Sequence, residues 1–301
     1  MGKTFIIARS NIRKSKGQTV ALIALIVIAS LMFNLWLMLS MDYRANFVRY
    51  HDKLNAEHVT LLTEDDSDEV KYFLSQTLAA DKNVAQYELT DCMYIVGSFP
   101  YNGGMMNGQF VFTEKQAALT RPIGRVEIVE SGSSSSGIYL PMIYKSGEID
   151  VDKPIDISLG SHTVTYTVCG FFNSVMMGSH NCALTQMLLT DDKYAELEKF
   201  DYALRSTLCS VRLKNVSVNI NFESSLKERV SERFNDVRLT SNCYDIVIQS
   251  RYISQMICSG VVSAMAFFVL LIALVVIASN IINYIQVNMK NLGALKAVGY
   301  T

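Results

Sequence analysis

The sequence lacks the short motifs that mark the common catalytic and metal-binding sites. It has no G-x-S-x-G, no Walker glycine loop followed by Lys-Ser/Thr, and no kinase signature. Its four histidines, His51, His58, His162 and His180, do not occur as H-x-x-x-H or H-E-x-x-H, so we predict no metal site. We therefore expect a protein that is not an enzyme, with no catalytic residue and no cofactor.

The six cysteines include no C-x-x-C pair, which excludes the usual spacing of zinc and redox sites. Cys258 lies in an apolar stretch. The other five cysteines are an odd number, so they cannot all form disulfides with one another. Cys169 and Cys182 flank a predicted hairpin loop and could form a disulfide. Free buried thiols in a reducing or anaerobic habitat are the alternative.

Formal charge is missing from two long stretches, the 25 residues 17–41 and the 38 residues 252–289. About 20 apolar residues suffice to cross the hydrocarbon of a bilayer, so both stretches predict transmembrane helices. The first is longer than the apolar region of a signal peptide and has no small-x-small cleavage site after it. We expect it to be retained as a membrane span.

Acidic residues are absent from both ends of the chain. Residues 1–41 contain five Lys or Arg, residues 256–301 contain two Lys, and all 28 acidic residues lie between them with 20 basic ones. The positive-inside rule then predicts a multi-pass protein of the plasma or inner membrane with both termini in the cytoplasm and an extracytoplasmic middle. An acidic exported segment also argues against a nucleic-acid partner.

Residues 3–16 are predicted to form a short amphipathic helix at the inner membrane surface. An ordinary basic flank of the first span explains the same pattern equally well. Asn34, in the first span, suggests a neighbouring helix, because an amide in hydrocarbon usually finds a hydrogen-bond partner there. The residues expected at the membrane interface, in contact with lipid, are Arg9, Arg13, Lys14 and Lys16.

The middle segment, 42–252, predicts a strand-rich α+β domain. The first span should continue helically to about residue 54, and Asp66 with Glu69 has the spacing of a capping box. Further helices are expected at 66–80, 191–199 and 222–234. Runs rich in β-branched and aromatic residues predict strands at 58–63, 87–99, 109–113, 125–129, 138–144, 155–159, 163–172, 186–190, 210–213 and 246–248.

Two methionine pairs, Met105-Met106 and Met176-Met177, are each expected in a loop beside glycine. Paired methionines can form an adaptable apolar surface for a substrate or partner. As side chains that close the core beneath a loop, they need no such role. The pattern alone leaves both interpretations open.

The two ends of the chain resemble a known family. Residues 8–19 read ARSNIRKSKGQT and residues 291–301 read NLGALKAVGYT. These stretches are similar to the N-terminal signature and the R-E-I-G-x-L-[RK]-A-[IVL]-G pattern of FtsX-like ABC transporter permeases of the MacB and LolC type. Residues 137–141, 155–160 and 164–172 are similar to parts of that family's MacB-like periplasmic core domain. Asn291 stands where the family has an acidic residue.

The resemblance implies that the helix after the second span is a coupling helix, which rests in a groove of a cytoplasmic ABC ATPase. The residues suit that role, because apolar side chains form one stripe, lysines can reach acidic groups, and glycine permits close approach. The expected ATPase contacts are Met289, Lys290, Leu292, Gly293, Leu295, Lys296 and Gly299.

The predicted organisation is a cytoplasmic amphipathic helix (1–17), a first transmembrane helix (18–41), an extracytoplasmic α+β domain (42–252), a second transmembrane helix (253–284) and a coupling helix (285–301). The family's permease module has four spans, so the resemblance predicts that this chain is truncated. Its expected partners are an ABC ATPase, a second permease copy or paralogue, and membrane lipid.

The predicted function is a permease subunit of mechanotransmission type, for export of a peptide or antibiotic or for handling of lipoprotein or lipid. It would couple ATP hydrolysis by a separate protein to motion of the exported domain. The alternative is a two-span membrane receptor with an extracytoplasmic sensor domain. Two further spans encoded downstream would favour the permease, and a soluble signalling domain the receptor.

Overall fold

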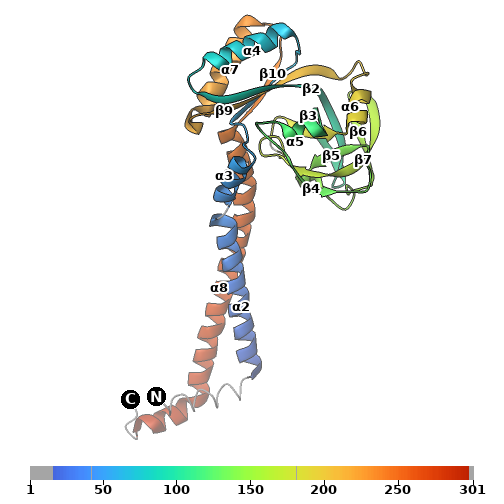
Figure 1. Ribbon diagram of the computed structural model, residues 1–301. Helices are drawn as coiled ribbons and strands as arrows, with labels where there is room; N and C mark the ends of the chain where they lie inside the picture. The colour runs from blue at the N-terminus through green and yellow to red at the C-terminus, as the bar shows by residue number, and fades with distance from the viewer. Residues whose placement is uncertain (1–15, 42, 181, 298–301) are drawn as a thin grey trace. The chain divides into compact units, whose positions relative to one another are not determined.

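The computed structural model describes residues 16–41, 43–180 and 182–297 (Figure 1). It divides into two compact units. The helical unit comprises Met1–Tyr43 and Ile253–Thr301, and the strand-rich unit comprises Arg44–Tyr252. The predicted division into cytoplasmic, membrane-spanning and extracytoplasmic segments stays a prediction.

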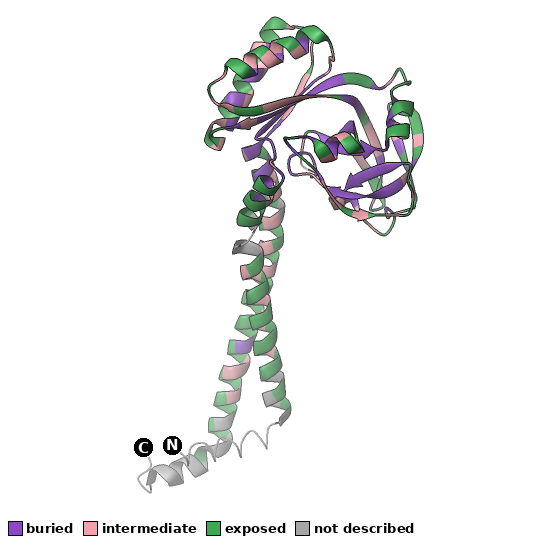
Figure 2. Ribbon diagram, viewed as in Figure 1, coloured by how far each residue is buried: buried purple, intermediate pink, exposed green. Residues whose placement is uncertain are grey.

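The helical unit contains α2 (Lys16–Met41) and most of α8 (Tyr244–Ala297), which is a single helix of 54 residues. Within the described residues, one stretch, Tyr244–Asn283 in α8, is long and apolar enough to cross a membrane. The apolar part of α2, Ile23–Met38, is shorter. Most described side chains of both helices are exposed (Figure 2). The first span therefore stays a prediction, while the second coincides with an observed apolar helix.

The strand-rich unit is an α+β domain, as the sequence predicts. Its helical elements are α3 (Tyr43–Lys53), α4 (Asp68–Ala80), α5 (Lys115–Thr120), η1 (Met142–Tyr144), α6 (Asp191–Leu197), η2 (Val216–Val218) and α7 (Asn219–Arg233). Its strands are β1 (Val59–Thr63), β2 (Val84–Tyr101), β3 (Gly104–Glu114), β4 (Glu127–Ser131), β5 (Ile138–Pro141), β6 (Pro154–Leu159), β7 (His162–Asn173), β8 (Thr185–Leu189), β9 (Leu204–Leu213) and β10 (Leu239–Cys243).

Six of the strands close into a barrel. The sheet order is β10-β1-β9-β2-β3-β8-β5-β7-β4, and β6 pairs with both β2 and β7, which joins β2, β3, β8, β5, β7 and β6 in a ring. The largest apolar cluster includes Phe99, Phe110, Phe171 and Met187, all fully buried. Gly97 lets β6 approach β2, since a Cβ there would lie 2.4 Å from the Ser158 carbonyl oxygen. The barrel thus encloses its own core.

The strand β2 is 18 residues long and belongs to two layers. Its first half pairs with β9, which continues through β1 to β10. Helices α4 and α7 cover one face of this extension, as Figure 1 shows. Leu74 of α4 and Leu226 of α7 lie in one cluster with Leu61 of β1. A three-strand extension with two helices therefore adjoins the barrel.

Local sequence explains several element boundaries. Helix α4 begins after Ser67, whose hydroxyl accepts a hydrogen bond from the Val70 N–H at 3.4 Å. The predicted capping box at Asp66 is therefore wrong by one residue. The turn between β2 and β3 is formed by Asn102 and Gly103, with φ of 50° and 74°. Such residues suit a tight hairpin, because both central positions need positive φ.

One sequence prediction is wrong near the start of α8. Residues 246–248 form no strand and belong to α8, whereas the strand of this region is β10, which ends at Cys243. The side-chain oxygen of Asn219 accepts a hydrogen bond from the Asp245 N–H at 3.2 Å. This tertiary contact satisfies an N–H of the first helical turn, which a short-range pattern of β-branched residues does not reveal.

The structure distinguishes between the alternative roles of the two methionine pairs and between free and disulfide-bonded cysteines. Met176 and Met177 are buried in an apolar cluster, so their role is in the core. Met105 is 55% exposed on β3, whereas Met106 packs against the barrel core. All six cysteines are free thiols, and four of them are buried. The possible disulfide between Cys169 and Cys182 is absent.

Candidate functional site

The predicted ATPase-contacting residues lie at the end of α8. This helix reaches Ala297, so residues 289–297 continue the apolar segment without a break. Met289 is 64% exposed. Gly299 and the interface residues Arg9, Arg13 and Lys14 lie outside the described residues, and Lys16 is the first residue of α2. The interface and ATPase contacts remain predictions.

Within the helical unit, α2 and α8 contact each other through small residues. Ala266 and Ala273 of α8 are 9% and 3% exposed, and they line a cavity of about 420 Å³ with Ala29 and Trp36 of α2. Small residues permit close approach of membrane helices. Asn34 is exposed and its amide donates to the Ser30 carbonyl of its own helix at 2.8 Å. The predicted neighbour of Asn34 is not α8.

The strand-rich unit receives two chain segments that lead to the predicted spans. These are α3 and the first turns of α8, and both contribute to one apolar cluster. The rings of Phe47 and Tyr244 meet edge to face at 5.5 Å. Arg251 lies 5.7 Å from the centre of the Phe47 ring and donates to the carbonyls of Ser174 and Val175 at 3.1 and 2.6 Å. The two segments are thus anchored together. We call this contact region the helix root.

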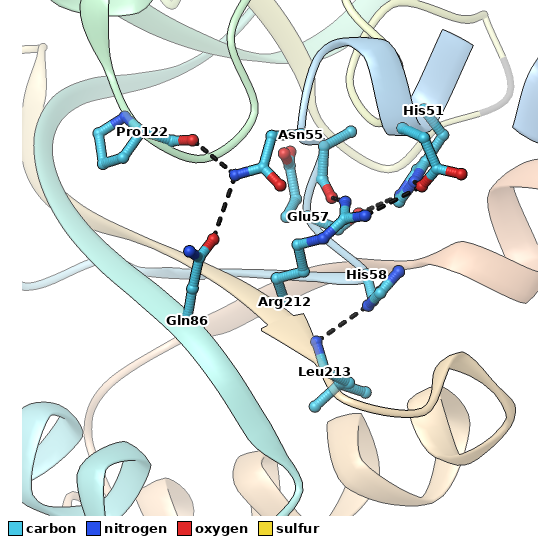
Figure 3. Close-up of polar contacts among 10 residues, drawn as sticks. His51, Asn55, Glu57, His58, Gln86, Pro122, Arg212 and Leu213 are labelled. Atoms are coloured by element: carbon cyan, nitrogen blue, oxygen red, sulfur yellow. Dashed lines mark hydrogen bonds and ion pairs between the residues drawn. The ribbon is translucent and has the colours of Figure 1, made fainter. Parts of the chain in front are cut away.

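Two histidines lie at the helix root. The rings of His51 and His58 stack at 4.9 Å with an angle of 9° between their planes, and Tyr244 meets the edges of both. His51 is 2% and His58 is 8% exposed. Nε2 of His51 donates to the Glu57 carbonyl at 2.9 Å, because a carbonyl can only accept. Nδ1 of His58 accepts from the Leu213 N–H at 2.9 Å (Figure 3).

Burial favours the neutral form of both histidines. Burial, together with the neighbouring charges of His51 and Arg212, lowers the pKa of His58 to about 4. Burial also lowers the pKa of His51, against the opposing effect of its hydrogen bond to Glu57. Arg212 donates to the Ala56 carbonyl at 2.6 Å and to Asp52 at 2.9 Å. The guanidinium of Arg212 lowers the pKa of Asp52.

The loop after α3 is fixed by a second set of polar contacts. Asn55 has a φ of 47°, and its side chain donates to the Pro122 carbonyl at 2.7 Å and to Gln86 at 3.1 Å (Figure 3). Short polar residues such as Asn tolerate this left-handed conformation. The Gly124 N–H donates to the Asn55 carbonyl at 3.0 Å. This loop therefore links α3 to β2 and to the segment after α5.

Two buried side chains of opposite charge, Glu57 and Arg121, lie next to Gly124. Glu57 and Arg121 are 2% and 4% exposed. Arg121 donates to the Ile123 carbonyl at 2.7 Å and to the Ser210 hydroxyl at 3.1 Å. A Cβ at Gly124 would lie 2.0 Å from Oε2 of Glu57 and 2.9 Å from Nη2 of Arg121, so both groups border the same spot. Glycine leaves the room that these two side chains occupy.

Helix α3 also contacts the barrel directly. The Tyr50 hydroxyl donates to Glu127 of β4, and Lys53 pairs with the same carboxylate at 2.7 Å. The Asn173 amide donates to the Tyr50 hydroxyl at 3.2 Å. Burial, followed by the hydrogen bond to Glu127, raises the pKa of Tyr50 to about 12. Both α3 and α8 therefore contact the end of β7 and the residues after it, 173–175.

The sequence analysis missed the helix root as a site. His51 lies in the last turn of α3 and His58 directly precedes β1, and their separation matches no ligand or catalytic spacing. Only the reversal of the chain between them brings their rings together. No group of three or more His, Cys, Asp or Glu that could hold a metal occurs in the part of the chain that the structure describes.

No family model and no curated protein matches the sequence. Solved structures that are similar to it include the following three. The periplasmic region of MacB from Actinobacillus actinomycetemcomitans is 8% identical with a TM-score of 0.30, over 69% of this chain and 98% of that one. A domain of a permease protein from Porphyromonas gingivalis is 13% identical with a TM-score of 0.28, over 63% and 90%.

The third similar structure is the extracellular domain of the noncanonic ABC-type transporter YknZ from Gram-positive bacteria. It is 9% identical with a TM-score of 0.28, over 60% of this chain and 99% of that one. The second of the three belongs to a permease protein and the third to an ABC-type transporter. Because TM-scores near 0.3 do not establish a common fold, the function proposed below rests on the chain's own features.

Proposed function

We propose that this chain is a permease subunit that couples ATP hydrolysis by a separate ABC ATPase to motion of an extracytoplasmic domain. It would perform no chemistry itself. In this proposal residues 18–41 and 253–284 span the plasma or inner membrane, residues 42–252 lie outside, and residues 285–301 contact the ATPase. The transported molecule would be a peptide or antibiotic, or a lipoprotein or lipid.

The observation that carries this proposal is the continuity of α8. The helix begins at Tyr244, inside the apolar cluster of the helix root, and continues to Ala297. At about 1.5 Å per residue, its 54 residues extend for roughly 80 Å. A force applied to the last turns would reach the strand-rich unit along one hydrogen-bonded rod.

The helix root supports the same proposal. Arg251 of α8 binds the carbonyls of Ser174 and Val175, and Tyr50 of α3 binds Asn173 and Glu127. Both segments therefore contact consecutive residues at the end of β7. A relative shift of α3 and α8 would act on the barrel at this place. The charge distribution of the sequence supports the proposed orientation, with basic ends inside and an acidic middle outside.

The test is recovery of the ATPase with the tagged chain after mild crosslinking in its native membrane. We expect an ABC ATPase to be recovered with the wild type and to be lost from L292D/L295D, because two carboxylates would disrupt an apolar contact. Val129→Asp, at a site that is 48% exposed in β4, serves as the matched control and should retain the partner. Absence of an ATPase from the wild-type sample, or its retention by the double variant, contradicts the proposal.

A further inference from the structure

His58 joins three segments of the strand-rich unit through its backbone and its side chain. Its N–H donates to the Val211 carbonyl of β9 at 2.8 Å, and its carbonyl accepts from the N–H of Tyr244, the first residue of α8, at 2.8 Å. Its Nδ1 accepts from the Leu213 N–H, at the end of β9. One residue thus connects the start of β1, the end of β9 and the start of α8.

The hydrogen bond from Leu213 restricts where a proton can go. A neutral imidazole has one nitrogen that accepts and one that carries a proton. Nδ1 of His58 is the accepting nitrogen, because the Leu213 backbone N–H can only donate. A protonated ring has no acceptor, so it would place two donors against each other. Protonation of His58 and the hydrogen bond from Leu213 therefore exclude each other.

The charged groups around the stack do not compensate a proton on His58. From β9, Arg212 repels it, and from α3, His51 does so if it is charged too. Asp52 of α3 attracts it, but this carboxylate is 62% exposed and already paired with Arg212.

His51 differs from His58 in this respect. Its Nδ1 lies 3.7 Å from Oδ1 of Asp52, and the Glu57 carboxylate also attracts a charge on its ring. Tyr244 of α8, whose pKa is raised by burial, stays neutral. An acidic neighbour could thus accommodate a proton on His51, whereas His58 faces a backbone donor.

We propose that the stacked His51–His58 pair is an acid-sensitive joint, in which proton uptake by His58 releases the Leu213 N–H and loosens the first turn of α8 from β1 and β9. This device does not depend on the ATPase partner proposed above. Its failure would leave the coupling proposal intact, and the reverse also holds. Outside acidity would act on the segment that leads into the membrane.

The direction of the pH effect follows from the lowered pKa. The stabilising contribution of neutral His58 is fully present above the ordinary histidine pKa of about 6.5 and declines as the pH falls from there to about 4. Within this window the open state binds one more proton than the closed state. The equilibrium constant for opening should then rise by up to about tenfold for each unit by which the pH falls.

The test is amide hydrogen exchange of the full chain in lipid nanodiscs, at pH 7 and pH 4.5, corrected for the intrinsic pH dependence of exchange. We expect protection to fall in peptides that cover residues 204–213 and 239–252. A peptide from α4, residues 68–80, serves as the internal control and should change much less. Equal changes in all three peptides, or no change in the first two, would overturn the proposal.

Three variants distinguish the effect of protonating His58 from the effect of changing the packing around it. His58→Asn places an amide oxygen near the position of Nδ1, so it should keep the acceptor at pH 7 and abolish the acid response. His51→Gln keeps a donor near the position of Nε2 and should retain the response. His162→Asn removes an exposed histidine on β7 and should behave as wild type.

A full acid response in H58N would contradict the joint. If H58N does not fold, the wild-type peptides still decide the matter, because they are compared with α4 in the same sample. The H51Q variant then provides the second comparison, since the proposal requires its acid response to persist.

Discussion

Different interactions stabilise each of the two compact units. The strand-rich unit contains four apolar clusters, and its barrel residues include Phe110 and Phe112 with no exposed surface. In the helical unit, the described side chains that are buried are those of Ala266 and Ala273. The strand-rich unit supplies its own hydrophobic stabilisation, whereas the apolar surface of α2 and α8 needs lipid or further helices to cover it.

We expect the largest loss of stability when a buried phenylalanine of the strand-rich unit is replaced, compared with an exposed phenylalanine of the helical unit. Phe110→Ala should lower the free energy of unfolding by about 3–5 kcal/mol, because it leaves a cavity inside the barrel. Phe268→Ala, at a site that is 63% exposed in α8, should cost less than about 1 kcal/mol. Urea unfolding of the full chain in nanodiscs, followed by tyrosine fluorescence, measures both. Similar losses for the two variants would refute the difference between the units.

A second comparison concerns buried and exposed arginines within the strand-rich unit. Arg121→Met should cost about 2–4 kcal/mol, since it removes two hydrogen bonds and leaves the Glu57 carboxylate buried without a neighbouring cation. Arg229→Met breaks the partly exposed pair with Asp81 and a long, exposed hydrogen bond to the Ser225 carbonyl, and it should cost less than about 1 kcal/mol. The same urea-unfolding measurement compares the loss of stability in the two variants. Restoration of stability in the Glu57→Gln/Arg121→Met double variant would confirm that the unpaired carboxylate causes the loss.

The smallest effect is expected in the helical unit. Ala273→Leu should weaken the contact between α2 and α8 by about 1–3 kcal/mol, because a larger side chain at this 3% exposed position would separate two helices that small residues allow to approach closely. Trp36 lines the same cavity as Ala273. Trp36 is the single tryptophan of the chain, so its fluorescence reports on this contact. The emission maximum and the midpoint of SDS unfolding in mixed micelles should both shift. Ala278→Leu, at an exposed position of the same helix, is the control and should shift neither.

Much of the fold follows from local sequence. The steps of four between Phe222, Leu226 and Val230 predict α7, and these three side chains are buried as that pattern requires. Nine of the ten predicted strands overlap an observed one, because the β-branched and aromatic runs are bounded by turn residues. Residues 246–248 fail, since a cap from Asn219, far away in sequence, favours helix there.

The helix root could not be predicted in the same way. His51 and His58 become neighbours only after α3, β1, β9 and α8 have assembled, and each carries its hydrogen bond to a backbone group. Backbone partners leave no signature in a sequence. The barrel closure likewise depends on β6 pairing with strands on both sides, which no short-range pattern specifies. By contrast, the long uncharged segment of α8 was evident from composition alone.

Because α8 is unbroken, the number of residues along it sets the angle between side chains at its two ends. Successive residues of an α-helix are turned by about 100°, so a single inserted residue in the middle of α8 would turn Met289 by about 100° relative to Tyr244. Seven inserted residues would bring the two back to within about 20°. In an unbroken helix, the number of residues between Tyr244 and Met289 therefore sets the angle between the helix faces on which these two residues lie.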